Sequence, residues 1–223
     1  MLKAIIFDFD GVIANTEPLH CRAFARALAD LSLSITENEY FAHCAGLNDN
    51  AIMRWVLDRA GLTADETAIA RTLKVKDRAY EAMIGDSAGL LLPGVHDWVV
   101  RAAGHLPLAI CSGAHRVEID KILGNAGLAE YFRVVVSAED VESSKPDPAG
   151  FIRTLGLLQG FVSGLAAEEC LVIEDSLPGL AAAKSAGMKV LAVQTYRTAE
   201  DLSAADLVVP DLRFVTNEDL AEL

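Results

Sequence analysis

Long hydrophobic runs are missing from this 223-residue chain. No apolar stretch approaches the ~20 residues that a membrane-spanning helix needs, so we expect no membrane partner. The first residues lead directly into a short apolar run, and we expect no signal peptide. A hydrophobic content of 52% with 23% charged residues is instead typical of a folded globular protein, whose length allows one large domain or two modest ones.

Cysteine is scarce, and the four cysteines form no Cys-x-x-Cys pair of the kind that indicates a zinc site or a redox motif. Scattered cysteines are typical of reduced thiols in an intracellular chain. We therefore predict reduced thiols and a cytoplasmic location, with a disulfide or a zinc role as the alternative. The four residues are Cys21, Cys44, Cys111 and Cys170.

Positive charge is also in short supply, because 19 Lys and Arg stand against 32 Asp and Glu, for a formal net charge of −13. Proteins that bind nucleic acid gather Lys and Arg along the phosphate backbone, so we expect no nucleic-acid partner. An anionic substrate would have to be held by a few well-placed positive groups rather than by the overall field.

Two carboxylates follow the first apolar run. Residues 4–7 predict a short buried strand, and Asp8, Asp10 and Gly11 come directly after it. Buried like charges are unfavourable unless a cation compensates them, and Mg²⁺ prefers one or two carboxylates with water and phosphate oxygens. The stretch therefore indicates a metal-dependent phosphoryl site at the end of a strand. The alternative is a polar turn in which both Asp side chains cap backbone groups.

Residues 16–86 show helical spacing with no convincing strand. Asp65 and Glu66 stand near the start of an amphipathic helix predicted over 63–84, as a helix N-terminus prefers. We predict a helical cap domain over 16–86, inserted into an α/β core domain of 1–15 and 87–223. Because the insertion follows the first strand, it would cover that strand's carboxyl end and exclude water there.

Short apolar strands alternate with helices after residue 87. This alternation predicts an α/β fold with a doubly wound parallel sheet that is covered on both faces, and ligands of such sheets bind beyond the carboxyl ends of the strands. The predicted strands are 4–7, 108–111, 134–137, 171–173, 190–193 and 207–209. The predicted helices are 95–103, 117–126, 148–158 and 180–186.

Three later strands also end in polar groups. Ser112 and Gly113 would offer a hydroxyl and free backbone N–H groups at a helix start, which suit a phosphate oxygen, and the alternative is an ordinary N-cap serine. Lys145 lies between rigid turn residues, although a solvated lysine is an equal alternative. Glu174 and Asp175 repeat the arrangement of the first motif.

Taken together and in this order, the motifs resemble the haloacid dehalogenase (HAD) superfamily, in the branch with a helical cap after the first strand. The similarity covers essentially the whole chain and is closest to β-phosphoglucomutase-like and phosphoglycolate phosphatase-like members. It implies an HAD-like Rossmannoid core and a phosphatase that acts on a small phosphorylated metabolite. The matching motifs are Asp8-Phe9-Asp10-Gly11-Val12, Ser112-Gly113, Ser144-Lys145-Pro146-Asp147, and Glu174-Asp175-Ser176 with Gly179 and Ala182-Ala183.

The resemblance also implies catalytic roles. Asp8 would be the nucleophile that forms an aspartyl-phosphate, and Asp10 would protonate the leaving oxygen and then activate water. Ser112, the Gly113 amide and Lys145 would hold the oxygens of the transferred group. Dehalogenases of the superfamily lack the second Asp and the metal, so Asp10 favours phosphoryl transfer.

By the same resemblance the cofactor would be Mg²⁺. The side chains of Asp8 and Asp175 and the carbonyl of Asp10 would bind it, and Glu174 would bind it directly or through water. The metal would offset the cluster of carboxylates.

Substrate choice in this family lies mostly in the cap, and the matching residues here are Gly46, Asn48 and Asp49, with Lys76 near the cap's return. β-Phosphoglucomutases usually carry Arg where this chain has Asp49, and an acid there would repel a bisphosphate intermediate. Hydrolysis of a sugar phosphate or a phosphoglycolate-like monoester is therefore favoured. Asp49 is also predicted to cap a helix that begins near residue 50, and Lys76 has the alternative of a solvated helix lysine.

Two alternatives stay open at this point. One is a sugar-phosphate mutase of the β-phosphoglucomutase type. The other is a phosphoaccepting or catalytically silent regulatory protein, although receiver domains of that kind are about half this length and lack a helical insertion. We expect a monomer or a weak homodimer.

Overall fold

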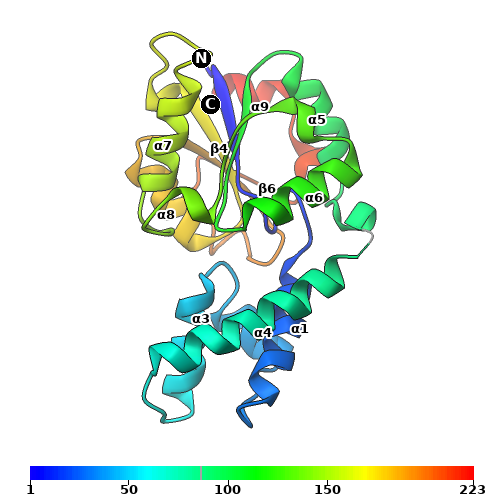
Figure 1. Ribbon diagram of the computed structural model, residues 1–223. Coiled ribbons are helices and arrows are strands. Elements are labelled where there is room, and N and C mark those ends of the chain that lie inside the picture. Colours follow the sequence, from blue (N-terminus) through cyan, green and yellow to red (C-terminus); the bar gives the residue numbers. More distant parts are fainter. Residues whose placement is uncertain (86) are drawn as a thin grey trace. The chain divides into compact units, whose positions relative to one another are not determined.

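A computed structural model describes residues 1–85 and 87–223 of the protein. The chain divides into two compact units, one made of Met1–Asn15 with Ser87–Leu223 and the other of Thr16–Asp86. Figure 1 shows the helices and strands of each unit, which are described separately below. The predicted boundary at residue 86 lies outside the described residues, and the roles of core and cap stay predictions.

The first unit is built on a six-stranded sheet in the order β3-β2-β1-β4-β5-β6, in which neighbouring strands are parallel. The strand order changes direction between β1 and β4, and sheets of this kind bind ligands at such a point. The predicted α/β fold with a parallel sheet is confirmed. The strands are β1 Ala4–Phe7, β2 Leu108–Cys111, β3 Phe132–Val136, β4 Cys170–Glu174, β5 Lys189–Val193 and β6 Leu207–Val209.

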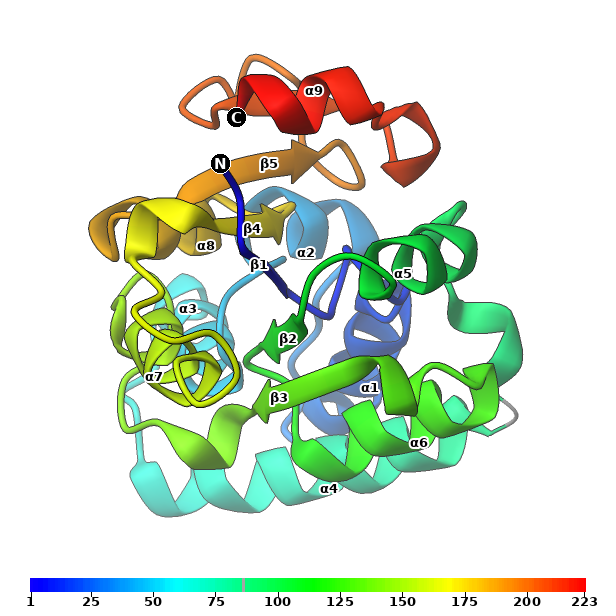
Figure 2. The same cartoon turned by 90° about the horizontal axis from the view of Figure 1, so that it is seen from above.

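Helices cover both faces of the sheet, as Figures 1 and 2 show. Ile6 belongs to the hydrophobic cluster that includes Phe151 and Leu180, on the face covered by α7 and α8. The next residue, Phe7, points to the other face and packs edge-on against Trp98 of α5, with ring centroids 5.6 Å apart. The helices of this unit are α5 Val95–Ala103, α6 Arg116–Ala126, α7 Ala149–Leu158, α8 Leu177–Ser185 and α9 Asn217–Glu222, with 3₁₀ turns at Ser87–Leu90, Ala129–Tyr131, Ala138–Asp140, Ala167–Glu169 and Leu212–Phe214.

The register of the central strands brings three chain segments to one edge of the sheet. Phe7, the last residue of β1, is level with Ile110 of β2 and with Ile173 of β4. The residues that follow these positions therefore leave the sheet side by side at its carboxyl edge. They include Asp8 and Glu174.

The second unit contains, among its described residues, the helices α1 Glu17–Ala29, α2 Glu37–His43, α3 Asp49–Arg59 and α4 Glu66–Ile84. A shared apolar core includes Phe24 of α1, Tyr40 of α2 and Ile52 of α3. The start of α2 is fixed by a capping box in which the Thr36 side chain accepts from the Glu39 N–H and the Glu39 side chain accepts from the Thr36 N–H.

Several predicted elements differ from the observed ones at their ends. α8 begins at Leu177, three residues before the predicted start, because the Ser176 hydroxyl caps it by accepting from the Gly179 N–H at 3.1 Å. β3 begins at Phe132, two residues early. The short helices α2 and α9 were not predicted, although the capping box of α2 is visible in the sequence.

No helix in the described part of the chain combines the length and the apolar character that crossing a membrane requires. All four cysteines are free thiols with buried side chains.

Candidate active site

Asp8 is the first residue after β1, and its carboxylate is buried at the carboxyl edge of the sheet, with the residue 7% exposed. Its N–H donates to the carbonyl of Ile173 in β4 at 2.9 Å, which fixes the direction in which the chain leaves the strand. A buried carboxylate is unfavourable without a compensating positive group. The position of Asp8 therefore depends on a cation nearby.

Lys145 supplies one such cation from the loop before α7. Its Nζ donates to Oδ1 of Asp8 at 2.7 Å and to Oε1 of Glu174 at 2.6 Å. The ammonium also lies 5.1 Å from the ring centroid of Phe151. The alternative of a solvated lysine is therefore wrong, because Lys145 bridges an acid that follows β1 and an acid that ends β4.

The charges of these three groups depend on one another. Burial raises the pKa of Asp8, Lys145 opposes that effect and Glu174 adds to it, with the result that the pKa rises from 3.8 to about 6. Burial works against the charge of Lys145, but Asp8 and Glu174 outweigh it and raise the pKa of the ammonium. Lys145 therefore stays protonated across the neutral range, while Asp8 changes charge near its lower end.

Glu174 ends β4 with a fully buried side chain. Its Oε2 accepts from the Asp175 N–H at 3.0 Å, from the Ser176 N–H at 3.1 Å and from the Ser176 hydroxyl at 3.0 Å. These donors stand at the N-terminus of α8, where a negative charge is favoured. The other oxygen, Oε1, accepts from Lys145, so the start of α8 fixes Glu174 and Glu174 fixes Lys145.

Asp175 lies against the loop that follows β1. A Cβ at Gly11 would stand 2.0 Å from Oδ2 of Asp175, and Gly11 has φ +76°. Glycine meets both conditions, since it has no Cβ and adopts positive φ readily. Asp8, Glu174 and Asp175 each offer a carboxylate oxygen, and these oxygens lie within 4.8 Å of one another.

The charge balance of this cluster suits a divalent cation. The three ionised carboxylates outnumber the single lysine, so the cluster carries a net negative charge. Carboxylate oxygens are the ligands that Mg²⁺ prefers, usually one or two with water. Glu174 Oε2 accepts hydrogen bonds from the start of α8, and its Oε1 accepts from Lys145. Asp8 and Asp175 are therefore the better direct ligands of the cation.

Ser112 and Gly113 follow β2, the strand beside β1. The Ser112 N–H donates to the Val136 carbonyl at 3.0 Å, and its hydroxyl accepts from the Ala114 N–H at 3.1 Å. The next helix, α6, begins at Arg116, so the N-cap alternative for Ser112 is wrong and its hydroxyl does not stand at the helix start. The phosphate-binding role of these residues stays a prediction.

Asp10 is partly exposed in the loop after β1, where it forms a backbone bridge with Ala14. It does not belong to the carboxylate trio of Asp8, Glu174 and Asp175. This placement agrees with a role for the Asp10 side chain in proton transfer rather than in holding the cation, and both roles stay predictions.

In the helical unit, Asn48 is the N-cap of α3, because its Oδ1 accepts from the Ala51 N–H at 2.9 Å. The prediction that Asp49 is the cap is therefore wrong by one residue. Asp49 instead accepts from Lys76 Nζ at 2.8 Å. The side chain of Lys76 is 3% exposed, which contradicts the alternative of a solvated helix lysine.

Gly46 has φ +84°, and its N–H donates to Oε1 of Glu17 at 3.1 Å. Glu17 is buried, and its Oε2 accepts from the Tyr40 hydroxyl at 2.6 Å. Glu17 therefore fixes the loop that carries Gly46 and Asn48 within the helical unit.

The family model described as haloacid dehalogenase-like hydrolase matches residues 5–193 of the chain. The chain belongs to the haloacid dehalogenase-like hydrolases. The predicted family is confirmed, and with it the prediction of an enzyme.

Relatives of this haloacid dehalogenase-like chain carry several functional names. Protein CbbY of Rhodobacter capsulatus is 33% identical over 229 residues, which cover 100% of this chain and 99% of the relative. The fructose-1-phosphate phosphatase YqaB of Escherichia coli is 32% identical over 190 residues, which cover 85% of this chain and 95% of that protein. The crystal structure of β-phosphoglucomutase from Clostridium difficile has the same fold, with a TM-score of 0.86 and 23% identity, and the match covers 100% of this chain and 96% of that chain.

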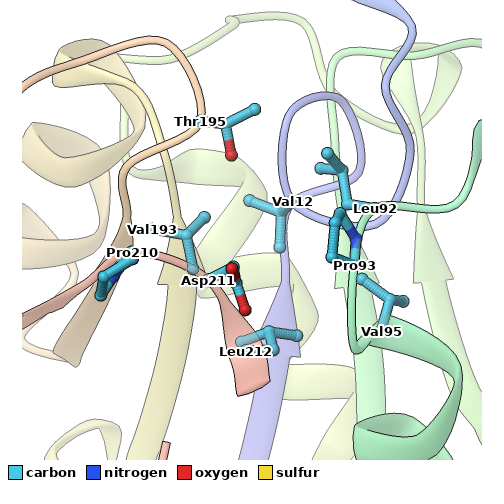
Figure 3. Close-up of a pocket in the computed structure, with 9 residues that line it drawn as sticks. All are labelled: Val12, Leu92, Pro93, Val95, Val193, Thr195, Pro210, Asp211 and Leu212. Carbon is cyan, nitrogen blue, oxygen red and sulfur yellow. The ribbon is translucent and has the colours of Figure 1, made fainter. Parts of the chain in front are cut away.

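A pocket of about 210 Å³ in this haloacid dehalogenase-like hydrolase is lined by Val12 of the loop after β1, by Val193 of β5 and by residues that follow β6. Figure 3 shows Val12 and Leu92 on one side of it, with Val193 and Asp211 opposite. Its wall is tied to the β1 loop, because the Thr195 hydroxyl donates to the Gly11 carbonyl at 2.6 Å. The carboxylate trio does not line this pocket.

Ser176 and Gly179 belong to the motifs that match the family, but the sequence predicted no role for either. The structure shows that Ser176 binds Glu174 and caps α8, and that a Cβ at residue 179 would stand 1.7 Å from Oε1 of Glu174. A serine three residues before a glycine, directly after two acids, was the available signal.

Proposed function

We propose that this chain is a Mg²⁺-dependent phosphatase that hydrolyses a small phosphomonoester through an aspartyl-phosphate on Asp8. The observation that carries the proposal is the bridge from Lys145 Nζ to Asp8 Oδ1 at 2.7 Å and to Glu174 Oε1 at 2.6 Å. It sets a protonated lysine beside a buried carboxylate at the carboxyl edge of a parallel sheet, where ligands bind.

In the first step, a carboxylate oxygen of Asp8 attacks the phosphorus atom and the bond from phosphorus to the substrate oxygen breaks. Asp10 donates its proton to that leaving oxygen. In the second step, water attacks the phosphorus of the aspartyl-phosphate while Asp10 accepts a proton. Inorganic phosphate leaves and the carboxylate of Asp8 is restored.

Residues of the site would also bind the transferred phosphoryl group and the metal. Lys145 places a positive charge beside the transferred oxygens, and Ser112 with the Gly113 amide would add hydrogen bonds to them. The carboxylates of Asp8 and Asp175 would hold Mg²⁺ with the Asp10 carbonyl. When bound, the metal offsets the negative charge of nucleophile and phosphate so that they can approach.

We expect the substrate to be a sugar phosphate or a similarly small monoester, because a relative 32% identical to this chain is named a fructose-1-phosphate phosphatase. Gly46, Asn48, Asp49 and Lys76 are the residues we expect to influence substrate choice from the helical unit. The predicted monomer or weak homodimer and the cytoplasmic location stay predictions.

A mutase is the second candidate, because the chain shares its fold with β-phosphoglucomutase. Asp49 is unfavourable for a mutase, because it stands where β-phosphoglucomutases usually carry Arg, and its pair with Lys76 supplies no net positive charge for a bisphosphate intermediate. Incubation with a hexose 1-phosphate separates the two, because a mutase yields the isomeric phosphate and a phosphatase yields inorganic phosphate.

The experiment that tests the proposal is a phosphate-release assay over a panel of phosphorylated metabolites, with Mg²⁺ and with EDTA. Turnover of at least one small monoester that requires Mg²⁺ supports the proposal. A purified, folded protein that releases no phosphate from any of them, or one that is equally active in EDTA, contradicts it.

A further inference from the structure

The bridge of Lys145 occupies carboxylate oxygens that a cation would also attract. Glu174 has committed Oε2 to three donors at the start of α8, so Oε1 is the oxygen it has left for a cation, and Lys145 Nζ lies 2.6 Å from it. On Asp8, the same ammonium holds Oδ1 at 2.7 Å. A lysine charge is thus fixed within the carboxylate trio.

Because the side chain of Lys145 is largely buried, its positive charge interacts strongly with the neighbouring carboxylates. Side-chain exposure is 15% for Lys145, 10% for Asp8 and 0% for Glu174, so water screens their interactions only weakly. Removing one partner of a buried ion pair is strongly destabilising, because the charge that remains is not compensated. The buried carboxylates therefore destabilise the fold unless a positive charge, either the lysine or a metal ion, compensates them.

We infer that Lys145 is an internal counter-ion whose charge opposes the binding of a divalent cation by Asp8 and Asp175. When the cation is removed, the lysine charge replaces part of the stabilisation that the cation provided. The inference rests on the carboxylate site of the proposed function. The two positive charges share Asp8, so each weakens the other's interaction with the site. By thermodynamic linkage, the free energy by which deletion of the lysine charge strengthens cation binding must equal the extra stabilisation that the saturating cation gives the altered protein over the wild type.

The test compares the wild type with Lys145→Met, Lys145→Arg and the control Lys76→Met. Lys76 is also buried and also pairs with an acid, Asp49 at 2.8 Å, but it belongs to the other compact unit. Isothermal titration with MgCl₂ gives the affinity for Mg²⁺. Thermal unfolding in EDTA and in saturating MgCl₂ gives the stabilisation that the ion provides.

In EDTA, the unfolding midpoint of Lys145→Met should fall by roughly 6–20 °C, and saturating Mg²⁺ should reduce this difference from the wild type. Its affinity for Mg²⁺ should rise about tenfold or more. Lys145→Arg keeps the charge and should keep an affinity near that of the wild type. Lys76→Met should lose the same stability in both buffers and bind Mg²⁺ unchanged.

An affinity of Lys145→Met for Mg²⁺ that equals or falls below that of the wild type overturns the inference. So does a loss of stability that is the same in both buffers, or a Met variant that stays unfolded in saturating Mg²⁺. Neither the Mg²⁺ affinity nor the unfolding midpoint requires the protein to turn over a substrate. A wild type that binds Mg²⁺ but releases no phosphate would therefore end the proposed function alone, whereas active wild type with an unchanged Mg²⁺ affinity in Lys145→Met would end this inference alone.

Discussion

Gly179 leaves open the space that the carboxylate of Glu174 occupies, because a Cβ at residue 179 would stand 1.7 Å from Oε1 of Glu174. That oxygen is the one that accepts from Lys145. The first turn of α8 and the lysine of a distant loop are therefore connected through one buried side chain.

Substitution of Gly179→Ala should displace Glu174 and release Lys145 from its second partner. We expect a loss of about 1–3 kcal/mol in the free energy of unfolding, as for overpacked cores, together with a large fall in kcat/KM. Urea denaturation and a phosphatase assay measure the two effects.

Gly156→Ala is the matched control, because Gly156 lies within α7 and a Cβ there would meet no atom within 4 Å. It should stabilise the protein by about 0.5–1 kcal/mol, since alanine favours a helix interior over glycine. Equal behaviour of the two alanine variants would remove Gly179 from its positioning role.

The pKa of Asp8 makes the stability of the metal-free protein depend on pH. The folded state holds the proton of Asp8 up to about pH 6, whereas the ordinary pKa is 3.8. The folded protein thus binds more protons than the unfolded chain in this window, and stability falls as pH rises through it. The rise in pKa corresponds to about 3 kcal/mol, present below the lower value and lost above the upper one.

Asp8→Asn lacks this titration and should not show that part of the fall. Urea denaturation in EDTA at about pH 4 and about pH 7 should therefore give a wild-type stability, relative to Asp8→Asn, that is lower at the higher pH by about 2–3 kcal/mol. A difference between the two proteins that does not change with pH would contradict the raised pKa.

Tyr40→Phe should destabilise the helical unit, because the lost hydroxyl donates to the buried carboxylate of Glu17 at 2.6 Å. We expect a loss of about 1–3 kcal/mol. A double-mutant cycle with Glu17→Gln should give a coupling energy of about 0.5–3 kcal/mol, and a coupling near zero would show that the contact contributes nothing.

The sequence was sufficient for the order of the strands along the chain and for the residues at the strand ends. Apolar runs such as residues 4–7 are short and bounded, so β1 and β2 have the predicted limits. Because carboxyl ends of parallel strands share an edge, the meeting of Asp8 with Asp175 followed from topology.

The sequence did not predict the geometry of the side chains. Nothing in a linear pattern says that Lys145 bridges Asp8 and Glu174, since the contact with Asp8 joins residues 137 positions apart. The burial of Lys76 was missed for the same reason, because its partner Asp49 lies on another helix. Helix starts were misplaced where a side chain decides them, as Ser176 does for α8.

The most direct test of the account is to look for phosphate on Asp8 itself. The protein is mixed with the best substrate of the panel, quenched in acid during turnover, digested and analysed by mass spectrometry. We predict one phosphoryl group on the peptide that contains Asp8, formed with Mg²⁺, not formed in EDTA, and absent from Asp8→Asn, which should be folded and inactive. Phosphate release at near wild-type rates by Asp8→Asn, or steady turnover with the Asp8 peptide never labelled, would contradict the account.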